Sequence, residues 1–337
     1  MKIALITTTI NVPTVLSLYR KLGPDVEFFV AGDHKTPVAA YEFCKTIDKC
    51  HFYSPQEQMD LGYKSSELIG WNTDSRRNIA LLEAVEWGAD IILSVDDDMI
   101  PTSEIFFEGP YLDFEPFSGL CAGEPGYWFD AGKFTVPPAK QRGLPVHYGL
   151  VNSFEPVVNA EIGVMQGIIL GVPDTDSLTA ITCEPRVYSV TDVLRNGFVV
   201  RPDALTVFNS QLTAFRRELA PGFAQFYRWQ GRNTDIFASL IMRRIMKERG
   251  LHTYFGPPMG YHARKSRQLF NDLKSEMYGL EHIVEVSDCV NRTKVGNYLS
   301  AAEQVADLYI QLSGLKWFDA FNHAAAMAWC DDIERVL

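Results

Sequence analysis

The first hundred residues alternate between short apolar runs and stretches with helical spacing. In chain order this pattern predicts a strand, a helix, a strand, a helix and a strand, at residues 2–8, 14–22, 26–30, 74–87 and 90–95. Gly23-Pro24 ends the first helix, for which Thr14 is a candidate N-cap, and Gly88 ends the second. Strands that alternate with helices form a mostly parallel sheet with helices on both faces, so the sequence predicts an α/β fold.

The rest of the chain is less regular, and its middle third is rich in Gly, Pro and aromatic residues. Its pattern predicts a strand, an amphipathic helix, a short strand and a mainly helical tail, at residues 163–172, 235–249, 252–255 and 298–336. No repeat or flexible linker interrupts the chain. We therefore expect one α/β domain and a helical C-terminal extension, at residues 1–290 and 291–337. The extension either packs on the core or forms a homo-oligomer contact.

The 337 residues have the composition of an ordinary globular protein, with 47% hydrophobic and 22% charged residues. No apolar run reaches the roughly 18 residues that span a membrane, and the N-terminus is typical of a strand rather than a signal peptide. The six cysteines form no CxxC pair, which favours reduced thiols and a cytoplasmic location. The net charge of −11 argues against broad nucleic-acid binding but leaves a local basic groove open.

Three consecutive carboxylates, Asp96, Asp97 and Asp98, follow directly after the strand at 90–95. Crowded carboxylates repel one another unless a cation lies among them, and Mn²⁺ and Mg²⁺ accept oxygen ligands. In an extended segment Asp96 and Asp98 point to one side and Asp97 to the other. Because ligands bind beyond the carboxyl ends of parallel strands, this Asp-x-Asp pair predicts a site for a metal ion with a diphosphate. A solvated loop that caps the next helix is the structural alternative.

Other charged residues fit the same kind of ligand. Arg77 lies at a helix start, where the helix dipole and a guanidinium favour phosphate, although a solvated helix end explains it as well. His262 could complete a metal shell, and the adjacent Arg264 and Lys265 could neutralise a diphosphate. Asp33 ends the second strand, where it is either an ordinary turn residue or an acceptor for a base or ribose.

Asp235 lies at the start of the helix predicted at 235–249. In that position it either caps the helix or faces the substrates. As a carboxylate in a substrate site it could act as a general base toward an acceptor hydroxyl, or it could position a donor sugar.

The order of these features resembles a known family. The features are TTTINVPT (7–14), AGDHKTP (31–37), SRRNIALL (75–82), the Asp triplet, GIILGVPD (167–174), GRNTD (231–235) and YHARKS (261–266). This series is similar to the reversibly glycosylated polypeptides and UDP-arabinopyranose mutases of plants, and its opening is similar to the STELLO proteins. Both groups are nucleotide-diphospho-sugar (GT-A-like) transferases.

The resemblance implies a GT-A-like (Rossmann-type) fold, with a nucleotide-binding half at 1–101 and an acceptor half at 102–290. It implies a UDP-sugar donor and a Mn²⁺ or Mg²⁺ ion held by Asp96, Asp98 and His262. The implied catalytic residues are Asp97, which orients the sugar, and Asp235, the second Asp of the family's Arg-x-Asp-Asp; Thr234 replaces the first. The residues assigned to the donor, by the resemblance or by charge, are Thr8, Thr9, Asp33, Arg77, Asp96, Arg264 and Lys265.

One departure bears on the reaction. The plant mutases carry an arginine that becomes reversibly glycosylated shortly before the Pro-Asp segment, whereas residues 143–184 contain no Arg or Lys. This favours a glycosyltransferase that moves a sugar, for example a pentose such as arabinose, to the hydroxyl of an acceptor. The acceptor is a glycan, a small molecule or a modified DNA base. A mutase and a non-catalytic nucleotide-sugar-binding scaffold are the alternatives.

Overall fold

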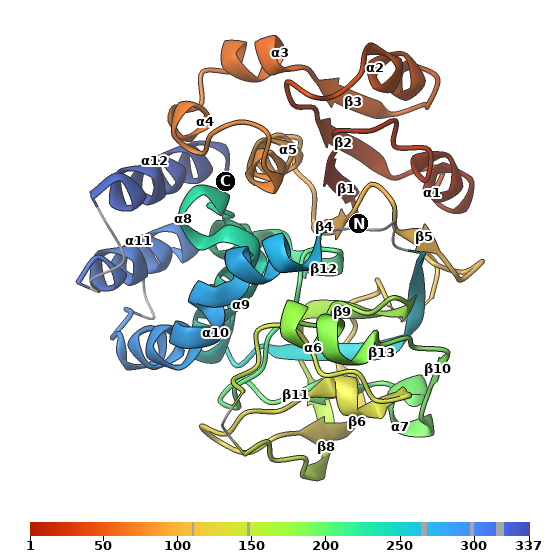
Figure 1. Cartoon of the computed structure of the whole chain (residues 1–337), viewed down its shortest axis with the longest axis vertical. Coiled ribbons are helices and arrows are strands. Elements are labelled where there is room, and N and C mark those ends of the chain that lie inside the picture. Colours follow the sequence, from red (N-terminus) through yellow and green to blue (C-terminus); the bar gives the residue numbers. More distant parts are fainter. Residues whose placement is uncertain (110, 147–148, 264–267, 297–299, 315–319) are drawn as a thin grey trace.

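The computed structural model describes residues 1–109, 111–146, 149–263, 268–296, 300–314 and 320–337. Within these ranges one sheet of 11 strands runs through the molecule, with helices packed around it (Figure 1). Its strands are β1 (Ile3–Thr8), β2 (Glu27–Ala31), β3 (Cys50–Tyr53), β4 (Ile91–Val95), β5 (Ile100–Pro101), β6 (Phe117–Ala122), β8 (Phe154–Ala160), β9 (Ile162–Gly171), β11 (Phe198–Val200), β12 (Leu212–Arg216) and β13 (His252–His262). Their order is β3-β2-β1-β4-β12-β9-β13-β11-β6-β8, and β5 pairs with β13.

The helices lie between these strands in the chain and after the last one. They are α1 (Leu16–Leu22), α2 (Val38–Lys45), α3 (Pro55–Asp60), α4 (Lys64–Leu68), α5 (Arg77–Glu86), α6 (Ser177–Cys183), α7 (Asp192–Asn196), α8 (Tyr227–Gln230), α9 (Thr234–Glu248), α10 (Leu269–Arg292), α11 (Ala301–Leu312) and α12 (Ala320–Val336). The structure also has short 3₁₀ helices, η1 (Asp74–Arg76), η2 (Ala131–Phe134), η3 (Arg217–Phe223) and η4 (Gly231–Asn233). A separate small sheet consists of β7 (Thr135–Val136) and β10 (Ser189–Val190). No helix in the described ranges is long and apolar enough to cross a membrane.

The first four strands of the sheet are parallel. β1 lies between β2 and β4, with Leu5 opposite both Phe28 and Leu93, and β3 pairs in parallel with β2. These strands are nearly continuous apolar runs, as expected for strands covered on both faces. Beyond β4 the pairing changes, because β12 is antiparallel to both β4 and β9. Parallel pairs recur between β9 and β13 and between β6 and β11, so the sheet is entirely parallel in its first half and mixed beyond it.

Alternate residues of β1 contribute to two different apolar cores, which places these cores on opposite faces of the sheet. Ile6 belongs to the core that contains α5, α9 and the C-terminal helices. Leu5 belongs to the core that contains α1, including Leu16 and Tyr19. The sheet is therefore covered on both faces at the edge where β1 and β4 end.

The C-terminal helices pack against the first half of the chain. α12 contacts α4, α5 and η3. Trp329 is fully buried, and its Nε1 donates to the Pro221 carbonyl oxygen at 2.8 Å. Asp332 accepts the backbone N–H groups of Lys64 and Ser65, at 3.0 and 2.7 Å, at the start of α4. The predicted extension thus shares a core with the elements that precede it.

Several predicted elements are confirmed within a residue or two: the strands at 2–8, 26–30, 90–95 and 163–172, and the helix at 235–249. The helix predicted at 74–87 corresponds to η1 followed directly by α5. Other features differ, among them the following three. α1 begins at Leu16, so Thr14 is not its N-cap. β13 is 11 residues long instead of ending at residue 255, with register shifts around Pro258. The 24-residue helix α10 had no counterpart among the predicted elements.

Candidate functional site

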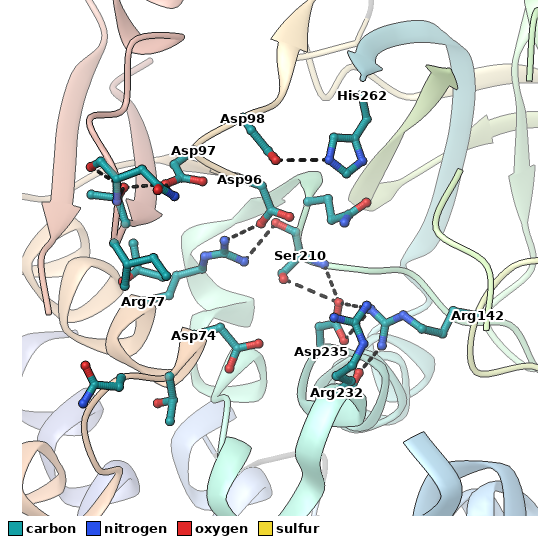
Figure 2. A pocket seen from close by; sticks show the side chains of 17 residues that line it. Asp74, Arg77, Asp96, Asp97, Asp98, Arg142, Ser210, Arg232, Asp235 and His262 are labelled. Atoms are coloured by element: carbon teal, nitrogen blue, oxygen red, sulfur yellow. Dashed lines mark hydrogen bonds and ion pairs between the residues drawn. The ribbon is translucent and has the colours of Figure 1, made fainter. Parts of the chain in front are cut away.

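A cavity of about 650 Å³ lies where β1 and β4 end and where α5 and α9 begin (Figure 2). Polar and charged side chains dominate its wall. The lining residues are Thr8, Thr9, Ile10, Asn11, Asn72, Thr73, Asp74, Arg77, Asp96, Asp97, Asp98, Arg142, Ser210, Gln211, Arg232, Asp235 and His262. The cavity therefore lies at the strand ends where the sequence analysis expected a ligand.

Most of the predicted site residues line this cavity: Thr8, Thr9, Arg77, Asp96, Asp97, Asp98, Asp235 and His262. Asp33 does not, because it is buried behind the loop that precedes η1. Its Oδ1 accepts from His34 N at 2.6 Å and its Oδ2 from Thr73 N at 3.2 Å. Asp33 thus holds in place a loop that reaches the cavity. Arg264 and Lys265 lie outside the described residues.

The Asp triplet forms a turn after β4 instead of an extended segment. Met99 N donates to the Asp96 carbonyl oxygen at 3.1 Å, so the chain changes direction within the triplet. Asp96 faces Arg77, with 2.6 Å between Oδ1 and Nη2, and Asp98 faces His262, with 3.2 Å between Oδ2 and Nε2 (Figure 2). The period of two expected for an extended segment therefore does not apply here, although Asp96 and Asp98 both line the cavity.

Asp97 points toward the end of β1. Thr9 Oγ1 donates to Asp97 Oδ2, and Asn11 Nδ2 lies 3.4 Å from the same oxygen. Burial raises the pKa of Asp97; the Thr9 hydrogen bond opposes this shift, while the charges of Asp96 and Asp98 add to it. The Thr9 hydroxyl is thus engaged in ordering the triplet.

Two of the three proposed metal ligands face each other. His262 Nε2 lies beside Asp98, and the buried Nδ1 of the same ring has no hydrogen-bond partner in the described part of the chain. Carboxylate and imidazole donors are suited to a divalent cation such as Mn²⁺. Asp96 is held by Arg77, and among the described residues no three His, Cys, Asp or Glu side chains are grouped to hold a metal ion. The donor types fit a metal, and Arg77 occupies only one of the two carboxylate oxygens of Asp96.

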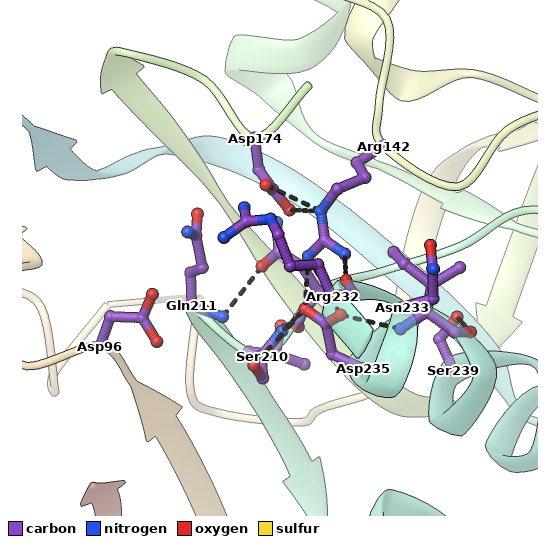
Figure 3. Close-up of polar contacts among 12 residues, drawn as sticks. Asp96, Arg142, Asp174, Ser210, Gln211, Arg232, Asn233, Asp235 and Ser239 are labelled. Carbon is purple, nitrogen blue, oxygen red and sulfur yellow. Dashed lines mark hydrogen bonds and ion pairs between the residues drawn. The ribbon is translucent and has the colours of Figure 1, made fainter. Parts of the chain in front are cut away.

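Asp235, in the first turn of α9, belongs to a buried ion network (Figure 3). Arg142 Nη2 lies 3.0 and 2.8 Å from its two carboxylate oxygens, and Ser210 N donates to Oδ2 at 3.1 Å. The Arg142 guanidinium also donates to Asp174, at 3.0 and 3.1 Å, and to the Arg232 carbonyl oxygen. Burial would lower the pKa of Arg142, but Asp174 and Asp235 outweigh burial and hold it well above the ordinary value. Asp235 is therefore fixed in place on several sides.

Helix α10 supports the floor of the cavity. Arg232 Nε donates to Glu276 Oε1 at 2.8 Å, and Arg232 Nη1 lies 3.8 Å from an Asp272 carboxylate oxygen. The other carboxylate oxygen of Glu276 accepts from Ser177 N at 2.6 Å, at the start of α6. Glu276 thus connects α6 to Arg232, which lines the cavity.

Several lining residues were not predicted from the sequence to be part of the site: Asn72, Thr73, Asp74, Arg142, Ser210 and Gln211. The glycine that follows Arg142 is the sequence feature that could have indicated this loop. Gly143 has a φ of 86°, and a Cβ there would lie 2.3 Å from Ile236 Cγ2, so glycine allows this loop to approach α9 closely. Arg142 directly precedes residues 143–184, the interval without Arg or Lys.

No family model matches the sequence, and no curated protein does. A solved structure with some similarity is residues 1–349 of S. aureus TarS in complex with UDP-GlcNAc. It is 12% identical, with a TM-score of 0.40 over 100% of this chain and 90% of that one. A match at this level assigns neither a family nor a substrate, so function has to be argued from the site.

Proposed function

We propose that the protein is a metal-dependent glycosyltransferase that moves a sugar from a UDP-sugar to an acceptor hydroxyl. The observation that carries this proposal is the meeting of Asp98 and His262, 164 residues apart in the chain, in the cavity that also contains Asp96 and Arg77. Carboxylates, an imidazole and a guanidinium at the carboxyl ends of strands suit a metal ion and a diphosphate. Uridine, and a pentose such as arabinose, come from the sequence resemblance.

Asp96, Asp98 and His262 are the residues that would hold Mn²⁺ or Mg²⁺. When bound, such an ion acts as a Lewis acid that stabilises the negative charge of a leaving diphosphate. The chain itself supplies fixed positive charge through Arg77, which lines the cavity at the start of α5. We assign Arg264 and Lys265 to the same task. Fixed charges of this kind favour the transition state because they are already oriented when the leaving group forms.

Asp235 is our proposed general base for a reaction that inverts the anomeric centre. Its carboxylate lies at the cavity wall, and it would take the proton of the acceptor hydroxyl. Arg142 and the Ser210 backbone hold it there, so Arg142 is a positioning residue. Asp97, anchored by Thr9, is assigned to orienting the transferred sugar.

The mutase is a second candidate, and Arg142 is the observation that favours it. The argument against a mutase was the lack of an arginine at residues 143–184. Arg142 lies just outside that interval, lines the cavity and contacts Asp174 of the Pro-Asp segment. A mutase converts UDP-arabinopyranose to the furanose form without an acceptor, whereas a transferase passes the sugar to an acceptor and releases UDP. Chromatography of the nucleotide sugars after incubation with enzyme alone separates the two.

The binding experiment is calorimetric titration of UDP, GDP, CDP and dTDP, each with and without Mn²⁺. We expect UDP to bind tightly only with Mn²⁺, and Asp98→Ala to weaken that binding by about tenfold or more because a metal ligand is lost. Asp25→Ala, an exposed carboxylate outside the cavity, is the matched control and should bind as the native protein does.

Absence of metal-dependent binding for all four nucleotides would overturn the transferase proposal and leave the triplet as a solvated turn. Tight, metal-independent binding without turnover would instead support a nucleotide-sugar-binding scaffold. If UDP binds as expected, acceptors from the glycan, small-molecule and modified-DNA classes can be screened with UDP-sugars.

A further inference from the structure

Five buried polar atoms on side chains of the cavity wall have no hydrogen-bond partner within the described ranges. They are Thr73 Oγ1, Asp74 Oδ1, Arg77 Nε, Gln211 Oε1 and His262 Nδ1. Buried polar groups in native proteins are nearly always paired, so each unpaired one needs an explanation. Because these five belong to residues that line one cavity, a ligand in that cavity would supply the missing partners.

Thr73 and Asp74 are adjacent, and their backbone is fixed although their side chains are not paired. Asp33 accepts the Thr73 N–H, and the Asp74 carbonyl oxygen accepts the Arg77 N–H at the start of α5. The Asp74 carboxylate lies beneath Arg77 and faces the cavity (Figure 2). A rigid backbone that presents unpaired side chains to a cavity is the arrangement of a binding site prepared before the ligand arrives.

The chemistry of these atoms selects the kind of group that binds. An ionised carboxylate only accepts hydrogen bonds, and it repels a phosphate, so the partner of Asp74 is a neutral donor. The Thr73 hydroxyl donates or accepts, and Arg77 Nε donates. A hydroxyl on a carbohydrate ring is a suitable partner for each of these groups, because it can donate one hydrogen bond and accept others.

We propose that Thr73 and Asp74 form a subsite that binds a ring hydroxyl of the nucleotide-sugar donor. This inference rests on the proposed function. In this proposal Thr73 and Asp74 recognise the donor, whereas the metal ligands and Arg77 bind its diphosphate. Asp74 is thereby a specificity-determining residue, since a donor that lacks the hydroxyl leaves its carboxylate unpaired.

Two rings of a UDP-sugar carry hydroxyls, the ribose and the transferred sugar, and titrations with Mn²⁺ distinguish them. The ligands are UDP, 2′-deoxy-UDP, 3′-deoxy-UDP, and a panel of UDP-pentoses and UDP-hexoses. If the subsite binds the ribose, Asp74→Asn weakens the binding of UDP by about tenfold to a hundredfold. The same substitution then has no effect on the binding of the deoxy analogue that lacks the bound hydroxyl. If the sugar is bound, UDP affinity is unchanged and UDP-sugar affinity falls by that factor.

Thr73→Val should cause a smaller loss of affinity for the same ligand. Asp332→Asn, which changes a buried carboxylate on α12 outside the cavity, should leave every affinity unchanged. Nucleotide affinities of Asp74→Asn equal to those of the native protein would overturn the subsite while the proposed function stands. So would an altered preference between UDP and CDP, which carry the same ribose, in place of sensitivity to a hydroxyl. Failure of the native protein to bind any nucleotide would overturn both.

Discussion

The carboxylates of the cavity differ in how their charge is compensated. Asp235 shares the Arg142 guanidinium with Asp174, and Asp96 is paired with Arg77. Asp74, in contrast, retains a buried oxygen without a partner in the described structure. An unpaired buried carboxylate costs stability when it is ionised, whereas a paired one does not to the same extent. Asp74 is therefore the position in this cavity where binding and stability oppose each other.

The ionisation of Asp74 gives a pH-dependent prediction. Burial and the charge of Asp235 raise its pKa to about 6 from 3.8, with Asp96 adding to the shift and Arg77 and Arg232 opposing it. Between these two values the folded state binds more protons than the unfolded state, so stability falls as pH rises through this window. We expect Asp74→Asn to raise the free energy of unfolding by roughly 1–3 kcal/mol at pH 8 and by little at pH 4.

Urea unfolding at pH 4 and pH 8 measures this difference. Asp25→Asn is the control, because its side chain is 98% exposed and the substitution should change stability little at either pH. A gain for Asp74→Asn of equal size at both pH values would show that its origin is not the ionisation of this carboxylate.

At the scale of elements, local apolar patterns predicted the strands and helices that build the first half of the site. β1, β4 and α5 are contiguous apolar or amphipathic segments with clear stop signals, and they position Thr9, Asp96 and Arg77. β13 was predicted too short because Gly256-Pro257-Pro258 is a typical stop signal. Its pairing with β9 continues past these residues through register shifts and carries the strand to His262. Long-range pairing of this kind leaves no local pattern in the sequence.

The same distinction applies to the site residues. Those at element ends, such as Asp98 and Asp235, follow recognisable segments and were predicted. Asp74, Arg142 and Ser210 reach the cavity through turns and loops whose directions depend on packing, so residue type and spacing alone did not indicate them. The turn within the Asp triplet was missed for a related reason, since an apolar strand followed by three carboxylates does not show where the extended backbone ends.

At the scale of the whole molecule, the C-terminal helices are part of the core that supports the site. Trp329 lies in the same apolar core as Ile79 and Leu82 of α5 and Ile241 of α9, the two helices that begin at the cavity. Asp332 binds the start of α4, which lies more than 260 residues earlier in the chain. Residues 291–337 were expected as an extension, and we infer from these contacts that they unfold together with the rest.

Substitution of Trp329 tests whether the C-terminal helices unfold together with the rest of the protein. Trp329→Ala should lower the free energy of unfolding by about 3–5 kcal/mol, because it leaves a large cavity in the core and removes the hydrogen bond to Pro221. Trp329→Phe retains most of the volume and should cost less. Calorimetry should record one unfolding transition for the native protein and for both variants, and variants that stay folded should bind UDP with native affinity, since Trp329 does not line the cavity. A separate early transition in Trp329→Ala, with the remainder melting at the native temperature, would show instead that the C-terminal helices form an independent unit.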